Sequence, residues 1–238
     1  MKHNILDYTD EDKFDVILMN PPYGGHEDKS IQSFFPNDLA SSETADLFLS
    51  VIMYRLKNKG RAAVVIPDSF LTGTDSAKVA IKKKLFSEFD VHTIIRLPNS
   101  CFAPYTPIAT NLVFFEKKGS TKKTWFYRYD LINGQKFSMR RNPITFDKLR
   151  GIVEWWNNRI EIQDEKEAES QRDSWKAREV CIKEIEENGY DLGFCSYPIE
   201  EIIVLPPEDT INAYIKERDI LNTKIDKKLE EIRNMLGV

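Results

Sequence analysis

Four consecutive residues near the start of the sequence, Asn20 to Tyr23, carry groups that suit the binding of an amine. The amide oxygen of Asn20 can accept a hydrogen bond from an exocyclic amino group. Pro21 and Pro22 hold φ at about −65°, so the loop is stiff before a ligand arrives. Because proline has no N–H, the Pro21 carbonyl stays free to accept a second hydrogen bond from the same amine. Tyr23 adds a flat ring on which an extruded base can stack.

The position of this tetrapeptide favours a site over a simple turn. It directly follows 14–19, a mostly apolar run that predicts a strand buried on both faces. In open α/β sheets, ligands bind beyond the carboxyl ends of the strands. Pro67 and Pro98 also follow apolar runs, so a strand-terminating turn is the alternative interpretation. Neither proline follows an asparagine or precedes a second proline and an aromatic residue.

The elements after the motif predict an α/β fold. Apolar residues three and four apart predict helices over 43–59 and 76–86. Apolar runs predict strands over 61–67 and 91–98. The resulting order of β, α, β, α, β with short connections is typical of right-handed parallel crossovers.

Two later runs, 111–118 and 124–129, are strand-like and are separated by a short loop that begins Gly119-Ser120. This spacing predicts a β-hairpin that adds antiparallel strands to an otherwise parallel sheet. We assign these elements to a first domain, residues 1–145.

The remaining residues, 146–238, are helical and charged in character. A mixed-charge segment, 163–173, is expected to be exposed, and 180–187 is expected to be a helix. From Thr210 onward, apolar residues three or four apart predict a long helix with a stripe narrow enough for a coiled coil. Packing on its own domain and binding of a partner both remain open for this helix.

The overall charge gives no argument for a polyanionic ligand, because the net charge is −4 and the pI is near 5.6. A surface that binds nucleic-acid phosphates must therefore be local or belong to another subunit. Basic clusters occur at 82–84, at 117–118 with 122–123, and at 140–141. A solvated face is the simpler interpretation of each cluster.

The three cysteines lie far apart and form no CxxC or Cys/His pattern. This spacing indicates neither a metal site nor a disulfide framework, and reduced thiols suit a cytoplasmic protein. The first residues contain no apolar core of a signal peptide, and no apolar run approaches membrane-spanning length. We expect a soluble cytoplasmic protein without a membrane partner.

Several stretches together resemble the modification (methylation) subunit of type I restriction–modification systems, an N6-adenine DNA methyltransferase family. The stretches are NPPY, GRAAVVIPDSFL, RLPNSCFAPYTPIATNLVFFEKKG, TWFYRY and IKEIEENGYDLGF. NPPY alone looks like the catalytic motif of several kinds of amino-group methyltransferase, whereas the long middle block is more specific. The resemblance runs from about Phe14 to about Pro198. It implies a partial, Rossmann-like S-adenosylmethionine-dependent methyltransferase sheet followed by a C-terminal helical region.

The resemblance implies that a target adenine flips into a pocket where Asn20 and the Pro21 carbonyl hold its N6 amine. The amine then attacks the sulfonium methyl group in line, without a covalent enzyme intermediate. Tyr23 would stack on the base, so the whole tetrapeptide is expected to be catalytic. A second aromatic residue from a later loop often contributes in such enzymes, and Phe102 and Tyr105 are the candidates. A core position is the alternative for Phe102.

Similar methyltransferases hold S-adenosylmethionine in the first half of the sheet, with a glycine-rich loop after the first strand. No such loop precedes Asn20, and the ten glycines form no FxGxG or GxGxxG cluster. Asn20 and Pro21 would face the methionine part of the cofactor. Asn4 aligns with a segment that contacts its adenine, where the family has an aspartate. The chain thus resembles the C-terminal portion of a subunit, as an engineered fragment, a split gene or a truncated reading frame. We expect weak cofactor binding and no activity by this chain alone.

The resemblance also implies partners, namely DNA, a specificity subunit that reads the DNA sequence, and a restriction subunit. In the family the strand before the motif lies mid-sheet, whereas 14–19 has one predicted neighbour here. Exposed apolar edge strands are avoided in natural proteins. We therefore expect self-association, or a displaced segment, to cover this edge.

Two other functions stay open from the sequence. The chain could be an interaction scaffold that holds the specificity subunit through its last helix, 210–238. It could also belong to an enzyme that methylates a protein glutamine or an RNA guanine. The block APYTPIATNLVFFEK argues against the second, because those families lack it.

Overall fold

A computed structural model describes residues 4–131, 134–164, 175–197 and 207–236 of the chain. Its contacts divide the chain into two compact units, Met1–Pro198 and Ile199–Val238. Each unit is described by itself. The expected functional division after residue 145 stays a prediction.

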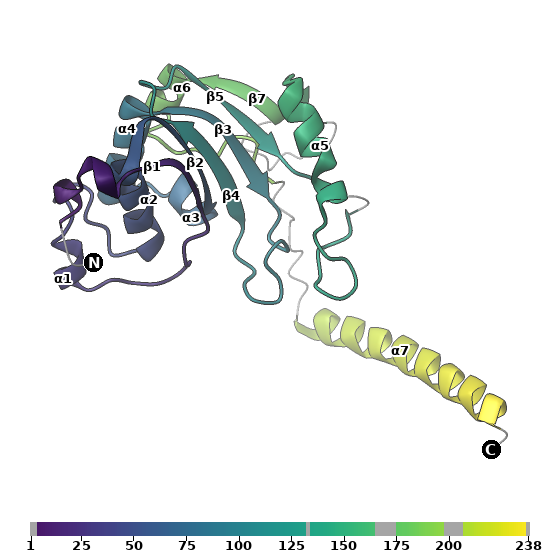
Figure 1. Cartoon of the computed structure of the whole chain (residues 1–238). Coiled ribbons are helices and arrows are strands. Elements are labelled where there is room, and N and C mark those ends of the chain that lie inside the picture. Colours follow the sequence, from purple (N-terminus) through teal and green to yellow (C-terminus); the bar gives the residue numbers. More distant parts are fainter. Residues whose placement is uncertain (1–3, 132–133, 165–174, 198–206, 237–238) are drawn as a thin grey trace. The chain divides into compact units, whose positions relative to one another are not determined.

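The first unit is built around a mixed sheet that has seven strands among the described residues (Figure 1). In spatial order the strands are β1 (Phe14–Met19), β2 (Leu56–Pro67), β4 (Thr110–Glu116), β3 (Asp90–Leu97), β5 (Lys123–Arg128), β7 (Trp175–Cys181) and β6 (Ile162–Gln163). β1, β2, β3 and β5 run parallel, whereas β4 and β7 are antiparallel to their neighbours. The expected α/β fold is confirmed.

Helices cover both faces of this sheet. The described helices of this unit are α1 (Lys29–Gln32), α2 (Thr44–Arg55), α3 (Asp68–Thr72), α4 (Ser76–Glu88), α5 (Phe146–Asn157) and α6 (Ile182–Glu187), with 3-10 turns at Ile5–Asp7 and Asp10–Asp12. The largest core cluster joins Ile52 of α2 and Leu85 of α4 to Val64 and Ile94 of the sheet. A second cluster places Ile152 and Trp155 of α5 with Ile95 of β3 and Tyr127 of β5.

The predicted hairpin is wrong, because β4 and β5 are separate strands that do not pair with each other. β4 lies between β2 and β3, where Val113 is opposite Val64 on one side and Ile94 on the other. Both edges of β4 are therefore already hydrogen-bonded, to β2 on one side and to β3 on the other. The connection then passes the start of β3, where Thr121 donates to the Phe89 carbonyl and accepts from the Val91 amide. β5 therefore pairs on the far side of β3.

The helix expected over 43–59 ends at Arg55, where β2 begins. Leu56 continues the helical spacing of apolar residues, yet it is completely buried as the strand partner of Phe14. The helix expected over 76–86 is confirmed as α4.

The segment after residue 146 is not wholly helical, because it supplies β6 and β7 to the sheet. Residues 180–181 therefore belong to a strand, and the helix expected from 180 begins at Ile182. Most of the segment expected to be exposed, 165–173, lies outside the described residues.

β1 is an edge strand, so the expectation that both of its faces are buried is wrong. Of its residues, only Ile17 is buried. Phe14, Val16 and Leu18 point to the other face and are 48%, 51% and 77% exposed. Among the described residues, β2 is its one neighbouring strand, and the Arg55 guanidinium at the end of α2 lies over the Phe14 ring.

The second unit contains α7 (Pro207–Leu236), which confirms the expected long helix. Ile211, Ile215, Leu221, Ile225 and Leu229 form an apolar stripe, and each is 39–58% exposed. Within the described parts of the chain, no helix is long and apolar enough to cross a membrane.

Candidate functional site

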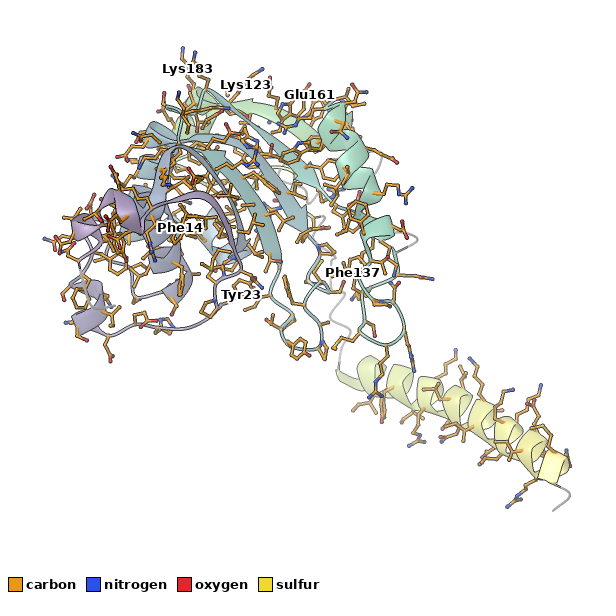
Figure 2. The ribbon with its side chains drawn as sticks, in the orientation of Figure 1. Phe14, Tyr23, Lys123, Phe137, Glu161 and Lys183 are labelled. Atoms are coloured by element: carbon orange, nitrogen blue, oxygen red, sulfur yellow. The ribbon has the colours of Figure 1, made fainter. Side chains whose placement is uncertain are left out.

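Three loops meet at one edge of the sheet, because β1, β2 and β3 are parallel and end there. Asn20 follows β1, Asp68 follows β2, and the loop 98–109 follows β3. Figure 2 shows Tyr23 at this edge, at the lower end of the sheet as drawn. The candidate site was expected at the carboxyl ends of the strands, and the motif lies there.

Tyr23 and Phe102 are brought together from positions far apart in the sequence. Their ring centroids lie 5.9 Å apart with an interplanar angle of 65°, an edge-to-face arrangement. Phe102 is half-buried against Tyr23, whereas Tyr105 is 81% exposed. The two candidate aromatic residues of this loop therefore differ. Phe102 packs against the Tyr23 ring, whereas Tyr105 faces solvent.

The polar groups of the motif form a local hydrogen bond. The Tyr23 hydroxyl donates to Oδ1 of Asn20, the oxygen that we expect to accept an amine. Burial raises the pKa of Tyr23 to about 12, so its hydroxyl keeps the proton at neutral pH. Pro21 is buried, and Asn20 is exposed. The second lone pair of Asn20 Oδ1 stays available to accept a hydrogen bond from an amine.

The loop after the motif is attached to the start of α2. The Thr44 amide donates to the Gly25 carbonyl over 3.0 Å, and the Glu27 amide donates to the Ser42 carbonyl over 2.8 Å. The Thr44 hydroxyl also donates to the Glu27 carboxylate, 3.0 Å away. A Cβ at Gly25 would collide with the Thr44 side chain, so only glycine permits this approach.

A buried ionic cluster in turn fixes the start of α2. Nζ of Lys78 lies 2.5 Å from Glu43, 3.3 Å from Asp46 and 3.2 Å from Asp75. Ser41 donates to the Asp46 carboxylate over 2.7 Å. Burial raises the pKa of Asp46, although Ser41 and Lys78 oppose the shift. The cluster therefore connects α4 to the residues that hold the loop after the motif.

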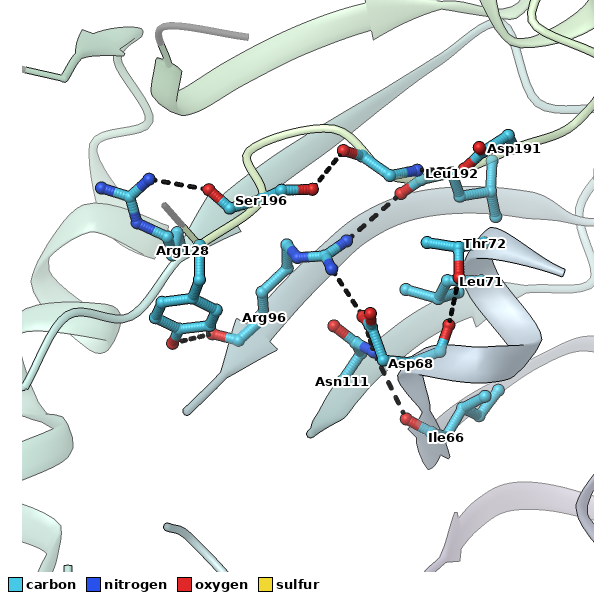
Figure 3. A network of polar contacts seen from close by, with 12 residues as sticks. Ile66, Asp68, Leu71, Thr72, Arg96, Asn111, Arg128, Asp191, Leu192 and Ser196 are labelled. Atoms are coloured by element: carbon cyan, nitrogen blue, oxygen red, sulfur yellow. Dashed lines mark hydrogen bonds and ion pairs between the residues drawn. The ribbon is translucent and has the colours of Figure 1, made fainter. Parts of the chain in front are cut away.

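A second network stabilises the neighbouring strand ends (Figure 3). Arg96 is buried in β3 and donates to Oδ1 of Asp68 over 2.5 Å, while the Asn111 amide donates to the same oxygen over 3.2 Å. Arg96 also donates to the Leu192 carbonyl over 3.5 Å. The network joins the ends of β2 and β3 to the start of β4, beside the candidate site.

This network was not predicted from the sequence. Arg96 was a visible signal, because it is a charged residue inside the apolar run of β3. Asp68 was a second signal, because it directly follows the strand-ending Pro67. Neither signal names a partner, since Asp68 and Arg96 are 28 positions apart in the sequence.

Asn4, the predicted contact to the cofactor, caps a turn in the structure, and its predicted role stays a prediction. Oδ1 of Asn4 accepts a hydrogen bond from the Leu6 amide over 3.0 Å and so caps the first 3-10 turn. Cys101 lies next to Phe102, but burial raises the pKa of its thiol to about 12. This thiol is therefore protonated at neutral pH and is a poor nucleophile. No group of three or more potential metal-binding side chains occurs among the described residues.

The chain is similar to proteins of known class. A sequence model of the N-6 DNA methylase family matches residues 2–202. The type I restriction enzyme EcoEI methylase subunit of Escherichia coli is 37% identical over 227 residues, which cover 95% of this chain and 44% of that protein.

Solved structures similar to this chain come from the same kind of protein. The modification subunit of a putative type I restriction enzyme from Vibrio vulnificus YJ016 is 38% identical with a TM-score of 0.68, covering 77% of this chain and 37% of that one. A chain from a structure of a type I R-M system is 31% identical with a TM-score of 0.70. The match covers 97% of this chain and 47% of that one. The present chain spans less than half the length of each of these relatives.

Proposed function

Because the chain belongs to the N-6 DNA methylase family, we propose that it is part of an N6-adenine DNA methyltransferase subunit of a type I restriction–modification system. One observation carries the proposal most directly: Asn20-Pro21-Pro22-Tyr23 ends β1 at the carboxyl edge of the sheet, with Phe102 against Tyr23. In this proposal residues 1–145 supply the half of the catalytic domain that receives the target base.

The proposed chemistry of this half is the orientation of an amine. Oδ1 of Asn20 and the Pro21 carbonyl accept the two N6 hydrogens of a flipped adenine, which directs the nitrogen lone pair away from them. Tyr23 and Phe102 line the side of the base. Orientation of a reacting group is worth about 7–11 kcal/mol in the best cases. S-adenosylmethionine supplies the electrophilic methyl group when it is bound in the complete enzyme.

In this proposal the chain supplies only part of the site for that cofactor. The glycines with closely packed surroundings are Gly25, Gly60 and Gly73, and each faces this chain's own atoms at Thr44, Lys57 or Lys78. At these three positions the space beside the glycine is filled by the chain itself. We propose that residues outside this chain hold the cofactor, and that the isolated chain binds it weakly and is inactive alone. Asn20 and Pro21 would then be the residues of this chain that lie beside the methionine part of S-adenosylmethionine.

Variants of the aromatic residues test how the base is held. Tyr23→Ala is expected to reduce methyl transfer by the complete enzyme roughly 5- to 150-fold, because base stacking is worth about 1–3 kcal/mol. Tyr23→Phe keeps the ring and should retain most activity. Phe102→Ala should also reduce activity, whereas Tyr105→Ala is the exposed control from the same loop. Steady-state rates on a DNA duplex measure all four variants. Equal losses for Tyr23→Phe and Tyr23→Ala would rule out stacking as the role of Tyr23.

We also propose two surfaces for protein partners. The exposed face of β1 would support self-association, and the apolar stripe of α7 would bind the specificity subunit, with a restriction subunit joining the assembly. The α7 stripe also supports the second candidate function, a scaffold for the specificity subunit. Methylation of a protein glutamine or an RNA guanine has less support, because the matching family acts on DNA.

Two variants test the proposed surfaces one at a time. Each should abolish one interaction and leave the other intact. Leu18→Lys should convert a concentration-dependent dimer into a monomer in sedimentation velocity, because a charge on this exposed edge opposes strand pairing. Deletion of 207–238 should leave that dimer intact but abolish capture of the specificity subunit. A wild-type chain that sediments as a monomer at every concentration would exclude the β1 contact.

A further inference from the structure

The loop between β5 and α5 carries three cations at the edge of the sheet where the candidate site lies. Lys136, Arg140 and Arg141 are all exposed, and none has an ion pair with a described residue. In the sequence, the cluster at 140–141 is simply compatible with a solvated face. Its position in the structure favours a more specific role.

Hydrogen bonds order residues 135–143 of this loop. The Ser138 amide donates to the Asn142 carbonyl and the Asn142 amide donates to the Ser138 carbonyl, each over 3.0 Å. The Asn142 side chain donates to the carbonyls of Gln135 and Lys136, both over 3.1 Å. Lys148 closes the base of the loop through the Asn142 side chain and the Pro143 carbonyl. The backbone of the two arginines lies in the turn of a small hairpin closed by Ser138 and Asn142.

Phe137, directly before the hairpin, contacts the loop that carries Phe102. The Phe137 amide donates to Oγ of Ser100 over 3.1 Å, and Ser100 is two residues before Phe102. The Phe137 ring stacks on Tyr129, with centroids 6.1 Å apart and an interplanar angle of 9°. Figure 2 shows Phe137 and Tyr23 at the same end of the sheet, whereas Lys123 lies at the other end. The cationic loop and the motif are therefore parts of one edge.

Two lysines at the opposite edge, Lys118 and Lys123, are paired with carboxylates instead. Lys118 pairs with Asp90 and Glu116 at 3.1 and 2.9 Å, and Lys123 pairs with Glu179 at 2.8 Å. Their charges are balanced within the protein. Because the whole chain has a net charge of −4, unpaired cations beside the candidate site are the local basic surface that a polyanion would require.

We propose that Lys136, Arg140 and Arg141 bind phosphates of the DNA strand that contains the target adenine. This assignment rests on the proposed function, in which the substrate is duplex DNA. A flipped base strains the backbone on both sides of its sugar, and cations fixed beside the pocket would hold that backbone in position. Arginine and lysine on a preformed hairpin supply these contacts without reading the sequence.

Binding of the 238-residue chain to a fluorescently labelled duplex with one mispaired adenine tests the assignment. Arg140→Ala/Arg141→Ala should weaken binding about tenfold at low salt. Two lost phosphate contacts should also lower the slope of log affinity against log salt by about 1.8. Arg140→Lys/Arg141→Lys should restore most of the binding, because lysine keeps the charge. Lys122→Ala/Lys123→Ala removes two charges from the opposite edge and should change binding less than twofold.

The assignment is overturned if the alanine variant binds within twofold of the wild type, if the control loses as much, or if the wild-type chain does not bind the duplex. Methyl transfer by the complete enzyme is measured separately. If transfer depends on Asn20 while the arginine variant binds normally, the phosphate site fails and the proposed function stands. If binding depends on the arginines but no N6-methyladenine forms, the proposed function fails and the phosphate site stands.

Discussion

Asn20→Ala is expected to reduce methyl transfer by the complete enzyme about 10²- to 10³-fold, through kcat more than through KM. The variant loses the side-chain oxygen that we propose accepts one N6 hydrogen, while the Pro21 carbonyl remains. Removal of one preorganised polar group from a reacting centre costs about 2.7–4 kcal/mol in comparable sites. Transfer of a labelled methyl group to DNA, measured at saturating and limiting substrate, gives both constants.

Asn99→Ala is the matched control for this variant. Asn99 is an exposed asparagine that directly follows a strand-ending proline on the neighbouring loop. It should retain nearly full activity. Asn20 is exposed as well, so its replacement should change the free energy of unfolding by no more than about 0.5 kcal/mol. A stable Asn20→Ala enzyme that transfers methyl groups at the wild-type rate would show that the motif does not hold the reacting amine.

Lys78→Met is expected to lower the free energy of unfolding by about 3–5 kcal/mol at neutral pH. Lys78 is 5% exposed and Asp46 is completely buried, so the variant leaves a carboxylate in the core without its cation. Oδ1 of Asp46 already has no hydrogen-bond partner among the described residues. Urea denaturation measures the loss. Lys84→Met is the control, because Lys84 pairs with Glu88 on the same helix at the surface, where such pairs contribute about 0.3–0.5 kcal/mol.

The deficit of Lys78→Met should depend on pH. Burial raises the pKa of Asp46 above its ordinary value even in the wild type, and loss of the nearby positive charge raises it further. Between the unfolded and folded pKa values the folded state binds more protons, so stability falls as pH rises through that window. The deficit should therefore be smaller at pH 5 than at pH 8. A deficit that grows on acidification would contradict this electrostatic explanation.

The sequence predicted the local parts of the site well. Asn20 to Tyr23 lie at the end of a strand because an apolar run followed by two prolines has few other conformations. Helix α4 was also predictable, since its apolar spacing and its Asp75 cap are both local features. The order of the strands was not predictable in this way, because the apolar run of β4 does not show which edges will pair.

Contacts between residues far apart in the sequence account for the other differences between the predicted and the observed structure. Leu56 fits a helical stripe and a strand equally well, and only its pairing with Phe14 decides for the strand. The contact of Asp68 with Asn111 spans 43 positions, and that of Tyr23 with Phe102 joins two loops. The weak apolar pattern of β7 buries only Ala177 and Val180, which explains why part of it was assigned to a helix.

The product formed on DNA is the most direct test of the proposed function. The part of the Escherichia coli EcoEI methylase subunit that matches this chain is replaced by this chain, and the chimaera is incubated with the specificity subunit, DNA and S-adenosylmethionine. Mass spectrometry of the nucleosides then identifies the methylated atom. We predict N6-methyladenine from the chimaera, and none from its Asn20→Ala form or from the present chain alone. Methylation of a different atom, or equal N6-methyladenine from the Asn20→Ala chimaera, would contradict the proposed function.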